Sequence, residues 1–143
     1  WEYQPITDRR MARRKFCSFI YTHDSNSLEG IVLRKKFFQL LRKYKHIDSP
    51  GKVFNNMTMP TAPRPKEKGK EHLEQWRLDK LNFIKDRKFV IAFENSCGDG
   101  YTTEKLPDAF HAHTIPIYFG NPNVGRDYNP KAFINVNDYN SLE

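Results

Sequence analysis

Polar side chains that could bind a ligand are concentrated between residues 94 and 105. This segment follows the apolar run 89–93, contains two glycines and ends in the sequence TTEK at 102–105. A threonine followed by acidic and then apolar residues predicts the start of a helix, where unpaired backbone amides favour an anion such as phosphate. Lys105 adds a full positive charge, whereas the carboxylate of Glu104 suits the hydroxyls of a ribose or another sugar.

A second cation, Arg34, could reach the same crevice from an earlier helix. Apolar residues at helical spacing predict one buried face for this helix: Leu33, Phe37, Leu40, Leu41 and Tyr44. Arg34 lies near the helix start, which Ser25, Asn26 or Ser27 could cap. The two cations and the free amides could bind a diphosphate, and the carboxylate could bind hydroxyls. Together they suggest a sugar nucleotide as the ligand. The plainer alternative is that the charged pair at 104–105 only decorates an exposed helical turn.

The surrounding sequence alternates between predicted strands and helices. Short apolar or aromatic runs predict strands at 16–21, 46–51 (running into a turn), 89–93, 114–119 and 133–136. Helices are predicted around 33–44, 71–84 and 102–111, the second with Leu73, Trp76, Leu81 and Ile84 on its buried side. This order predicts an α/β fold, a Rossmann-like parallel sheet with helices on both faces. Ligands of such sheets bind beyond the carboxyl ends of the strands, although neither a GxGxxG fingerprint nor a P-loop is present.

The net charge of +7 is distributed unevenly along the chain. It amounts to +6 over residues 1–48, +5 over 49–88 and −4 over 89–143. A basic nucleic-acid-binding module resting on residues 9–15 is therefore an alternative that the acidic last third disfavours. The two cysteines, Cys17 and Cys97, form no CxxC pair, and no aspartates stand at DxD spacing. The sequence thus implies neither a disulfide nor a metal site.

The segment 93–120 resembles the signature of the α-1,3/4-fucosyltransferases. The matching residues are FENS at 93–96, YTTEK at 101–105, Ala109, IPI at 115–117 and Gly120. KFCSF at 15–19 and FINVND at 133–138 match the same family in the same order. The resemblance therefore spans about residues 15–138, and the stretch HTIPIYFG is of the type found in bacterial members.

This resemblance implies a fold, a reaction and a missing part. Residues 15–143 would be the GDP-fucose-binding, carboxyl-terminal half of a GT-B glycosyltransferase, with residues 1–14 as a lead-in or interdomain segment. The full-length enzyme would transfer L-fucose from GDP-fucose, with inversion, to an N-acetylglucosamine or glucose hydroxyl of a glycan such as a Lewis-type antigen. The general base would belong to the amino-terminal acceptor domain, which this chain lacks. We therefore expect no catalytic residue here, and weak binding of GDP or GDP-fucose without turnover.

The resemblance also implies partners. These are GDP-fucose and, through the missing domain, a glycan acceptor, with no nucleic acid, no cofactor and no metal. Peripheral contact with a membrane is left open, and the implied location is the bacterial cytoplasm or the cytoplasmic face of the inner membrane, or the Golgi membrane in a eukaryote. A non-catalytic homologue that keeps the donor fold to bind a nucleotide sugar is the remaining alternative.

Six donor-binding residues are carried over by position: Arg34, Asn95, Tyr101, Thr102, Glu104 and Lys105. The resemblance implies that Thr102 contributes its backbone and that Glu104 holds ribose or fucose hydroxyls. Arg34 and Lys105 would neutralise the negative charge that builds on the departing GDP. Pro107 departs from the usual residue of the family, so we expect a distorted first turn in the helix that contains it.

Overall fold

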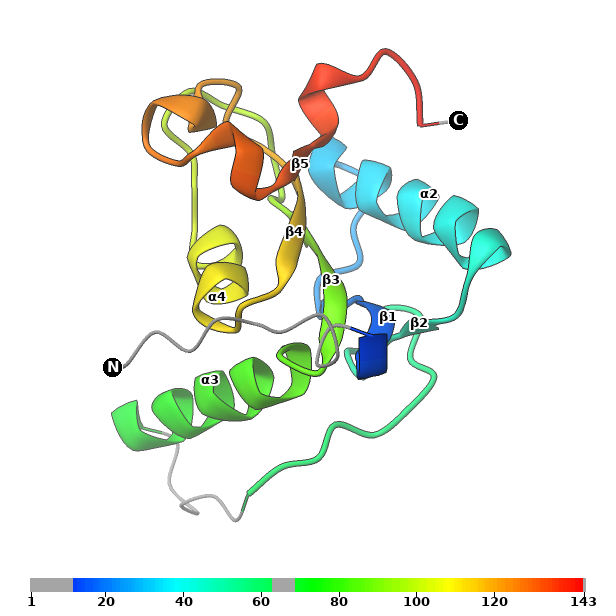
Figure 1. Cartoon of the computed structure of the whole chain (residues 1–143), viewed down its shortest axis with the longest axis vertical. Coiled ribbons are helices and arrows are strands. Elements are labelled where there is room, and N and C mark those ends of the chain that lie inside the picture. Colours follow the sequence, from blue (N-terminus) through cyan, green and yellow to red (C-terminus); the bar gives the residue numbers. More distant parts are fainter. Residues whose placement is uncertain (1–11, 63–68, 143) are drawn as a thin grey trace.

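The computed structural model describes residues 12–62 and 69–142 (Figure 1). The strands are β1 (Lys15–Ser18), β2 (Ile47–Asp48), β3 (Arg87–Phe93), β4 (Ile115–Phe119) and β5 (Ile134–Asn135). The α-helices with both ends in this part are α2 (Glu29–Tyr44), α3 (Lys70–Ile84) and α4 (Lys105–His111). Short 3-10 turns lie at Val124–Arg126, Pro130–Ala132 and Val136–Asp138. The first eleven residues of the predicted lead-in are outside the described part.

The strands form one parallel sheet in the order β2-β1-β3-β4-β5. Cys17 of β1 lies opposite Phe89 of β3, and Val90 of β3 lies opposite Pro116 of β4. Each strand that follows a helix in the chain therefore runs parallel to its neighbours, as crossover connections require. The predicted α/β, Rossmann-like sheet is confirmed.

Successive side chains of β3 point to opposite faces of the sheet and meet different helices. Ile91 and Phe93 pack in one cluster with Phe38 of α2. Val90 packs on the other face with Phe83 of α3. Figure 1 shows the same division, with α2 on one side of the strands and α3 and α4 on the other. Helices therefore cover both faces, as predicted.

The buried face of α2 is rotated from the predicted apolar stripe. Its buried residues are Gly30, Ile31, Arg34 and Phe38. Leu33, Phe37 and Leu41 are partly buried beside them. Tyr44, expected in the core, is 77% exposed, and its ring meets Phe16 edge-on at 5.7 Å. The helix begins at Glu29, so its first turn already packs on the sheet, and the rotation carries Arg34 into the interior.

The first half of α3 is exposed, contrary to the prediction. Leu73 and Trp76 are 68% and 37% exposed, because α3 meets the sheet only through its last turn. The side chains of α3 that face α4 are Arg77 and Lys80. The fully buried carboxylate of Asp108 accepts hydrogen bonds from Arg77 Nε (2.9 Å) and Lys80 Nζ (3.0 Å). Ion pairing, which hydropathy does not reveal, thus joins the two helices.

Candidate functional site

The carboxyl ends of β1 and β3 mark the point where the strand order changes direction. β1 is followed through α2 by β2 on one side, whereas β3 lies on the other side of β1. The loops 19–28 and 94–104 leave these two strand ends. In open parallel sheets the crevice between two such loops is the usual place for a ligand. All six predicted site residues belong to the second loop or to the helices that follow the two loops.

Tyr21 continues the pairing of β1 with β3 after β1 has ended. Its hydroxyl accepts a hydrogen bond from the backbone N–H of Phe93 (2.7 Å) and lies 3.0 Å from the carbonyl oxygens of Ile91 and Phe93. Burial raises the pKa of this phenol, although the charge of Arg34 opposes the shift. Tyr21 therefore stays protonated and holds the two strand ends together at the crevice.

Arg34 joins the loops 19–28 and 94–104 and is completely buried. Its guanidinium stacks 3.9 Å above the ring of Tyr21 and donates hydrogen bonds to Asn95 Oδ1 and to the carbonyl oxygen of His23, both at 2.7 Å. Within the described part its Nε is buried without a hydrogen-bond partner. Burial lowers the pKa of Arg34, but an arginine remains charged in proteins. The structure thus brings Arg34 and Asn95 together.

The amino end of α2 touches the loop after β3, backbone to backbone. The N–H of Gly30 donates to the carbonyl oxygen of Asn95 at 3.1 Å. A Cβ atom at this position would lie 2.1 Å from the carbonyl oxygen of Glu94. Glycine is required here by this close approach, which sets the distance between Arg34 and its partner.

Glu94 is a buried residue of the site to which the sequence analysis assigned no role. Its carboxylate is fully buried and accepts hydrogen bonds from the Thr103 N–H (2.8 Å), the Thr103 hydroxyl (2.7 Å) and Lys105 Nζ (2.8 Å). Lys105 also donates to Thr103 Oγ1 at 2.8 Å, and its side chain is 18% exposed. Lys105 is therefore more than decoration of an exposed turn. The sequence did contain a signal for this role, because Glu94 is an acidic residue directly after the apolar run 89–93.

Asn121 is the second buried polar side chain that holds the loop 94–104. Its Oδ1 accepts from the N–H of Gly100 (3.1 Å), and its Nδ2 donates to Thr102 Oγ1 (3.2 Å). Its own N–H donates to the hydroxyl of Tyr118 at 2.9 Å. Sequence reasoning missed Asn121 because its partners lie about twenty positions earlier in the chain. Glu94 and Asn121 together fix the loop from two neighbouring strand ends.

The remaining predicted residues lie where the loop meets solvent. Tyr101 is 41% exposed, the side chain of Glu104 is 55% exposed, and Thr102 is half-buried. The helix predicted to start at the threonines begins later: Glu104 occupies the N-cap position of α4, and Thr103 bonds to Glu94. The helix runs without interruption from 105 to 111 with Pro107 in its first turn, where proline is tolerated.

The caps proposed for α2 are wrong. Leu28 stands at the N-cap position, while Ser25 and Ser27 hydrogen-bond to each other at 2.7 Å. Asn26 accepts from Lys35 Nζ at 2.7 Å. These polar side chains organise the loop 19–28 itself.

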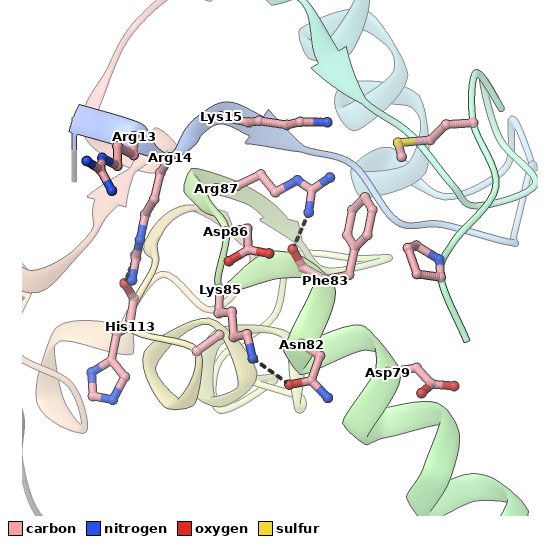
Figure 2. Close-up of a pocket in the computed structure, with 13 residues that line it drawn as sticks. Arg13, Arg14, Lys15, Asp79, Asn82, Phe83, Lys85, Asp86, Arg87 and His113 are labelled. Atoms are coloured by element: carbon pink, nitrogen blue, oxygen red, sulfur yellow. Dashed lines mark hydrogen bonds between the residues drawn. The ribbon is translucent and has the colours of Figure 1, made fainter. Parts of the chain in front are cut away.

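A cavity of about 870 Å³ lies at the opposite, amino edge of the sheet. Figure 2 shows that its cationic side chains point in different directions. Arg87 and Lys15 are paired with Asp48 at 2.7 and 3.3 Å, Arg14 donates to the carbonyl of His113, and Lys85 donates to Asn82 at 2.9 Å. None of the six predicted site residues lines this cavity. The cavity is therefore separate from the candidate site.

Three further observations refer to residues 12–62 and 69–142. These residues contain no cluster of three or more His, Cys, Asp or Glu side chains that could hold a metal ion. Cys17 and Cys97 are free thiols, and burial raises the pKa of Cys17 to about 12. No helix in this part combines the length and apolar character needed to cross a membrane.

Known proteins are similar to this chain in sequence. The model of glycosyltransferase family 10 (fucosyltransferase), C-terminal part, matches residues 11–143. The chain is 32% identical over 131 residues to the α-(1,3)-fucosyltransferase FucT of Helicobacter pylori, and this alignment covers 92% of the chain and 23% of FucT. It is 33% identical over 119 residues to α-(1,3)-fucosyltransferase B of Drosophila melanogaster, and this alignment covers 81% of the chain and 25% of the fly protein. The chain therefore spans about a quarter of the length of these relatives.

Solved structures share the fold. A crystal structure of an α1,3-fucosyltransferase with GDP-fucose aligns with a TM-score of 0.71 at 32% identity and covers 95% of this chain and 33% of that chain. A crystal structure of an α1,3-fucosyltransferase with GDP aligns with a TM-score of 0.72, also at 32% identity over 95% of this chain and 33% of that chain. By sequence and by fold, the chain belongs to glycosyltransferase family 10, the fucosyltransferases, and represents their C-terminal domain.

Proposed function

We propose that this chain binds GDP-fucose in the crevice between β1 and β3 and is the donor-binding domain of an α1,3-fucosyltransferase. The observation that carries the proposal is that two cations are bound to consecutive residues at the carboxyl end of β3, Lys105 to Glu94 and Arg34 to Asn95. The crevice is also where an open parallel sheet takes its ligand. The similarity to an α1,3-fucosyltransferase solved with GDP-fucose supports the choice of donor.

The exposed side chains of the site are assigned to parts of the donor. The carboxylate of Glu104 would accept hydrogen bonds from ribose or fucose hydroxyls. Lys105 would bind the diphosphate, because its ammonium group uses two of its three N–H donors on Glu94 and Thr103 and keeps one. Tyr101 is exposed beside them and would contact the donor as well. Asn95 and Thr102 are half-buried, and Thr102 would contribute its backbone.

Arg34 acts in this proposal from inside the protein. Its guanidinium is enclosed by Tyr21, Asn95 and the carbonyl of His23, so direct contact with a phosphate requires that carbonyl to move away. Without such movement its charge still favours a nearby diphosphate, because solvent screens a buried charge weakly. As the fucosyl bond breaks, negative charge builds on GDP, and Arg34 and Lys105 would stabilise it.

The acceptor side of the reaction belongs to the part of the enzyme that precedes this domain. We propose an inverting transfer to an N-acetylglucosamine or glucose hydroxyl of a glycan, such as a Lewis-type antigen. The general base would be a carboxylate of the amino-terminal domain. The cytoplasmic face of a bacterial inner membrane, or the Golgi membrane in a eukaryote, stays the predicted location.

Calorimetric titration with GDP tests the donor assignment. We expect wild type to bind GDP weakly but more tightly than ADP, and Lys105→Ala to lose about tenfold or more in affinity. Glu104→Ala should lose a similar factor toward GDP if its carboxylate holds the ribose, and only toward GDP-fucose if it holds the fucose. A hydrogen bond to a charged group contributes about 1.5–3 kcal/mol, which corresponds to that range. Lys43→Ala, which removes an exposed lysine in the last turn of α2, should bind like wild type. Equal GDP affinity in wild type and Lys105→Ala would show that the diphosphate lies elsewhere.

The isolated chain is expected to transfer no fucose. It contains the proposed donor site but not the domain that would supply the general base. Incubation with GDP-fucose and N-acetyllactosamine, followed by mass spectrometry of the glycan, measures this directly. Fucosylated product formed by the 143-residue chain alone would contradict the proposal that the general base lies in another domain.

A further inference from the structure

We propose that Glu94 is a positioning residue for the donor, because its buried carboxylate holds the ammonium group of Lys105 in the orientation that meets the diphosphate. This inference rests on the function proposed above.

Glu94 is built into the fold as an acceptor for the residues around it. The carboxylate is fully buried, and its two oxygens accept three hydrogen bonds, two from Thr103 and one from Lys105. A buried carboxylate is tolerated only with such partners. Gly120 leaves the necessary space, because a Cβ atom at that position would lie 2.6 Å from Glu94 Cγ. The loop after β3 and the end of β4 are thus shaped around this side chain.

The consequence of this arrangement falls on Lys105. A lysine ammonium on a flexible four-carbon stem normally samples many directions. Here, two N–H groups are directed at Glu94 Oε2 and Thr103 Oγ1, both at 2.8 Å, which leaves the direction of the third fixed. Glu104 Oε1 lies 3.9 Å from the same nitrogen and is mostly exposed, so it constrains Lys105 less. A group ordered before binding loses less entropy when the ligand arrives.

Glutamine at position 94 would disturb this geometry without changing the volume of the side chain. If its amide oxygen faces the Thr103 N–H, its NH₂ group faces the ammonium of Lys105. If the amide is flipped, the NH₂ group faces the Thr103 N–H. In either orientation two donors oppose each other.

A purely structural role for Glu94 is the competing explanation, and the chain offers a matched control. Asp108 is also fully buried and also paired with a lysine, Lys80 at 3.0 Å, but it does not contact Lys105. We expect Glu94→Gln to lower GDP affinity at least tenfold, whereas Asp108→Asn should bind GDP within about threefold of wild type. Similar GDP affinities in the two variants would overturn the positioning role.

A double-substitution experiment tests whether Glu94 acts through Lys105. In a Lys105→Met background, Glu94→Gln should change GDP affinity by no more than about threefold, because the group that it positions is gone and only its bonds to Thr103 remain to be lost. A further tenfold loss in that background would mean that Glu94 acts by another route. Thr103→Val, which keeps the charge of Glu94 and removes one partner, should give a smaller loss and serves if Glu94→Gln does not fold.

The orientation of Lys105 can also be measured without nucleotide. Acetylation of lysines by a small reagent, read by mass spectrometry, should be slow at position 105 in wild type and in Asp108→Asn, and faster in Glu94→Gln. If wild type shows this protection but does not bind GDP, the proposed function fails while the ion pair stands. Unchanged protection in Glu94→Gln would overturn the inference itself.

Discussion

Alanine at position 30 is expected to lower the free energy of unfolding by up to about 2 kcal/mol, the cost of overpacking less the gain in helix propensity, and to abolish the binding of GDP. A Cβ atom on Gly30 would lie 2.1 Å from the carbonyl oxygen of Glu94 and 2.8 Å from that of Asn95. Both obstacles are backbone, so α2 or the loop after β3 must move. Overpacking costs about 1–3 kcal/mol or more, and the better helix propensity of alanine returns about 1 kcal/mol of it.

The same displacement would separate the parts of the site. It would break the hydrogen bond from the Gly30 N–H to the Asn95 carbonyl and carry Arg34 away from Asn95 Oδ1. Urea denaturation followed by circular dichroism gives the stability, and calorimetry gives the affinity for GDP. Gly98→Ala is the control, because its Cβ atom would be 3.8 Å from the nearest atom, Tyr101 Cβ. A Gly30→Ala protein as stable as Gly98→Ala would contradict the close packing of α2 against the loop.

The fold could be predicted from sequence because its strands are marked locally. The run 89–93 is apolar throughout, as suits a strand covered on both faces, and β3 includes it. The order of the strands is a different matter, since no local pattern states that β3 joins β1 on the side away from β2. The exposed half of α3 was mispredicted for a related reason: Lys80 and Arg77 are drawn to Asp108 of another helix.

The candidate site could be predicted in part. The residues named from charge and spacing, among them Arg34, Asn95 and Lys105, do gather at one strand edge. The residues that hold them were missed, because their roles depend on partners far away in the chain. Tyr21 bonds to Phe93, seventy-two positions later. Glu94 was part of the recognised motif, but its burial against Gly120 appears only in three dimensions.

Asparagine at position 48 is expected to lower the free energy of unfolding at neutral pH by about 3–5 kcal/mol, the usual cost of breaking a buried ion pair. The side chain of Asp48 in β2 is 7% exposed and accepts hydrogen bonds from Arg87 Nε (3.1 Å) and Nη2 (2.7 Å) at the start of β3. Arg87 is equally buried, so the substitution would leave an uncompensated charge inside the protein. Lys15 of β1 contacts the same carboxylate at 3.3 Å, so that three strands meet at Asp48.

The size of this effect depends on pH. Burial raises the pKa of Asp48, but the hydrogen bond and charge of Arg87, together with Lys15, outweigh it, so the pKa in the folded protein is below the ordinary 3.8. A depressed pKa stabilises the fold fully above the unfolded value, and this stabilisation is lost as pH falls through the folded value. The difference between wild type and Asp48→Asn should therefore be largest at neutral pH and shrink as the pH falls below the ordinary 3.8 and through the depressed pKa of the folded protein, as urea denaturation at several pH values would measure. Lys15→Met, which removes a 63% exposed partner of the same carboxylate, should cost less than about 1 kcal/mol. Equal losses in Lys15→Met and Asp48→Asn would show that the buried pair with Arg87 is not what joins these strands.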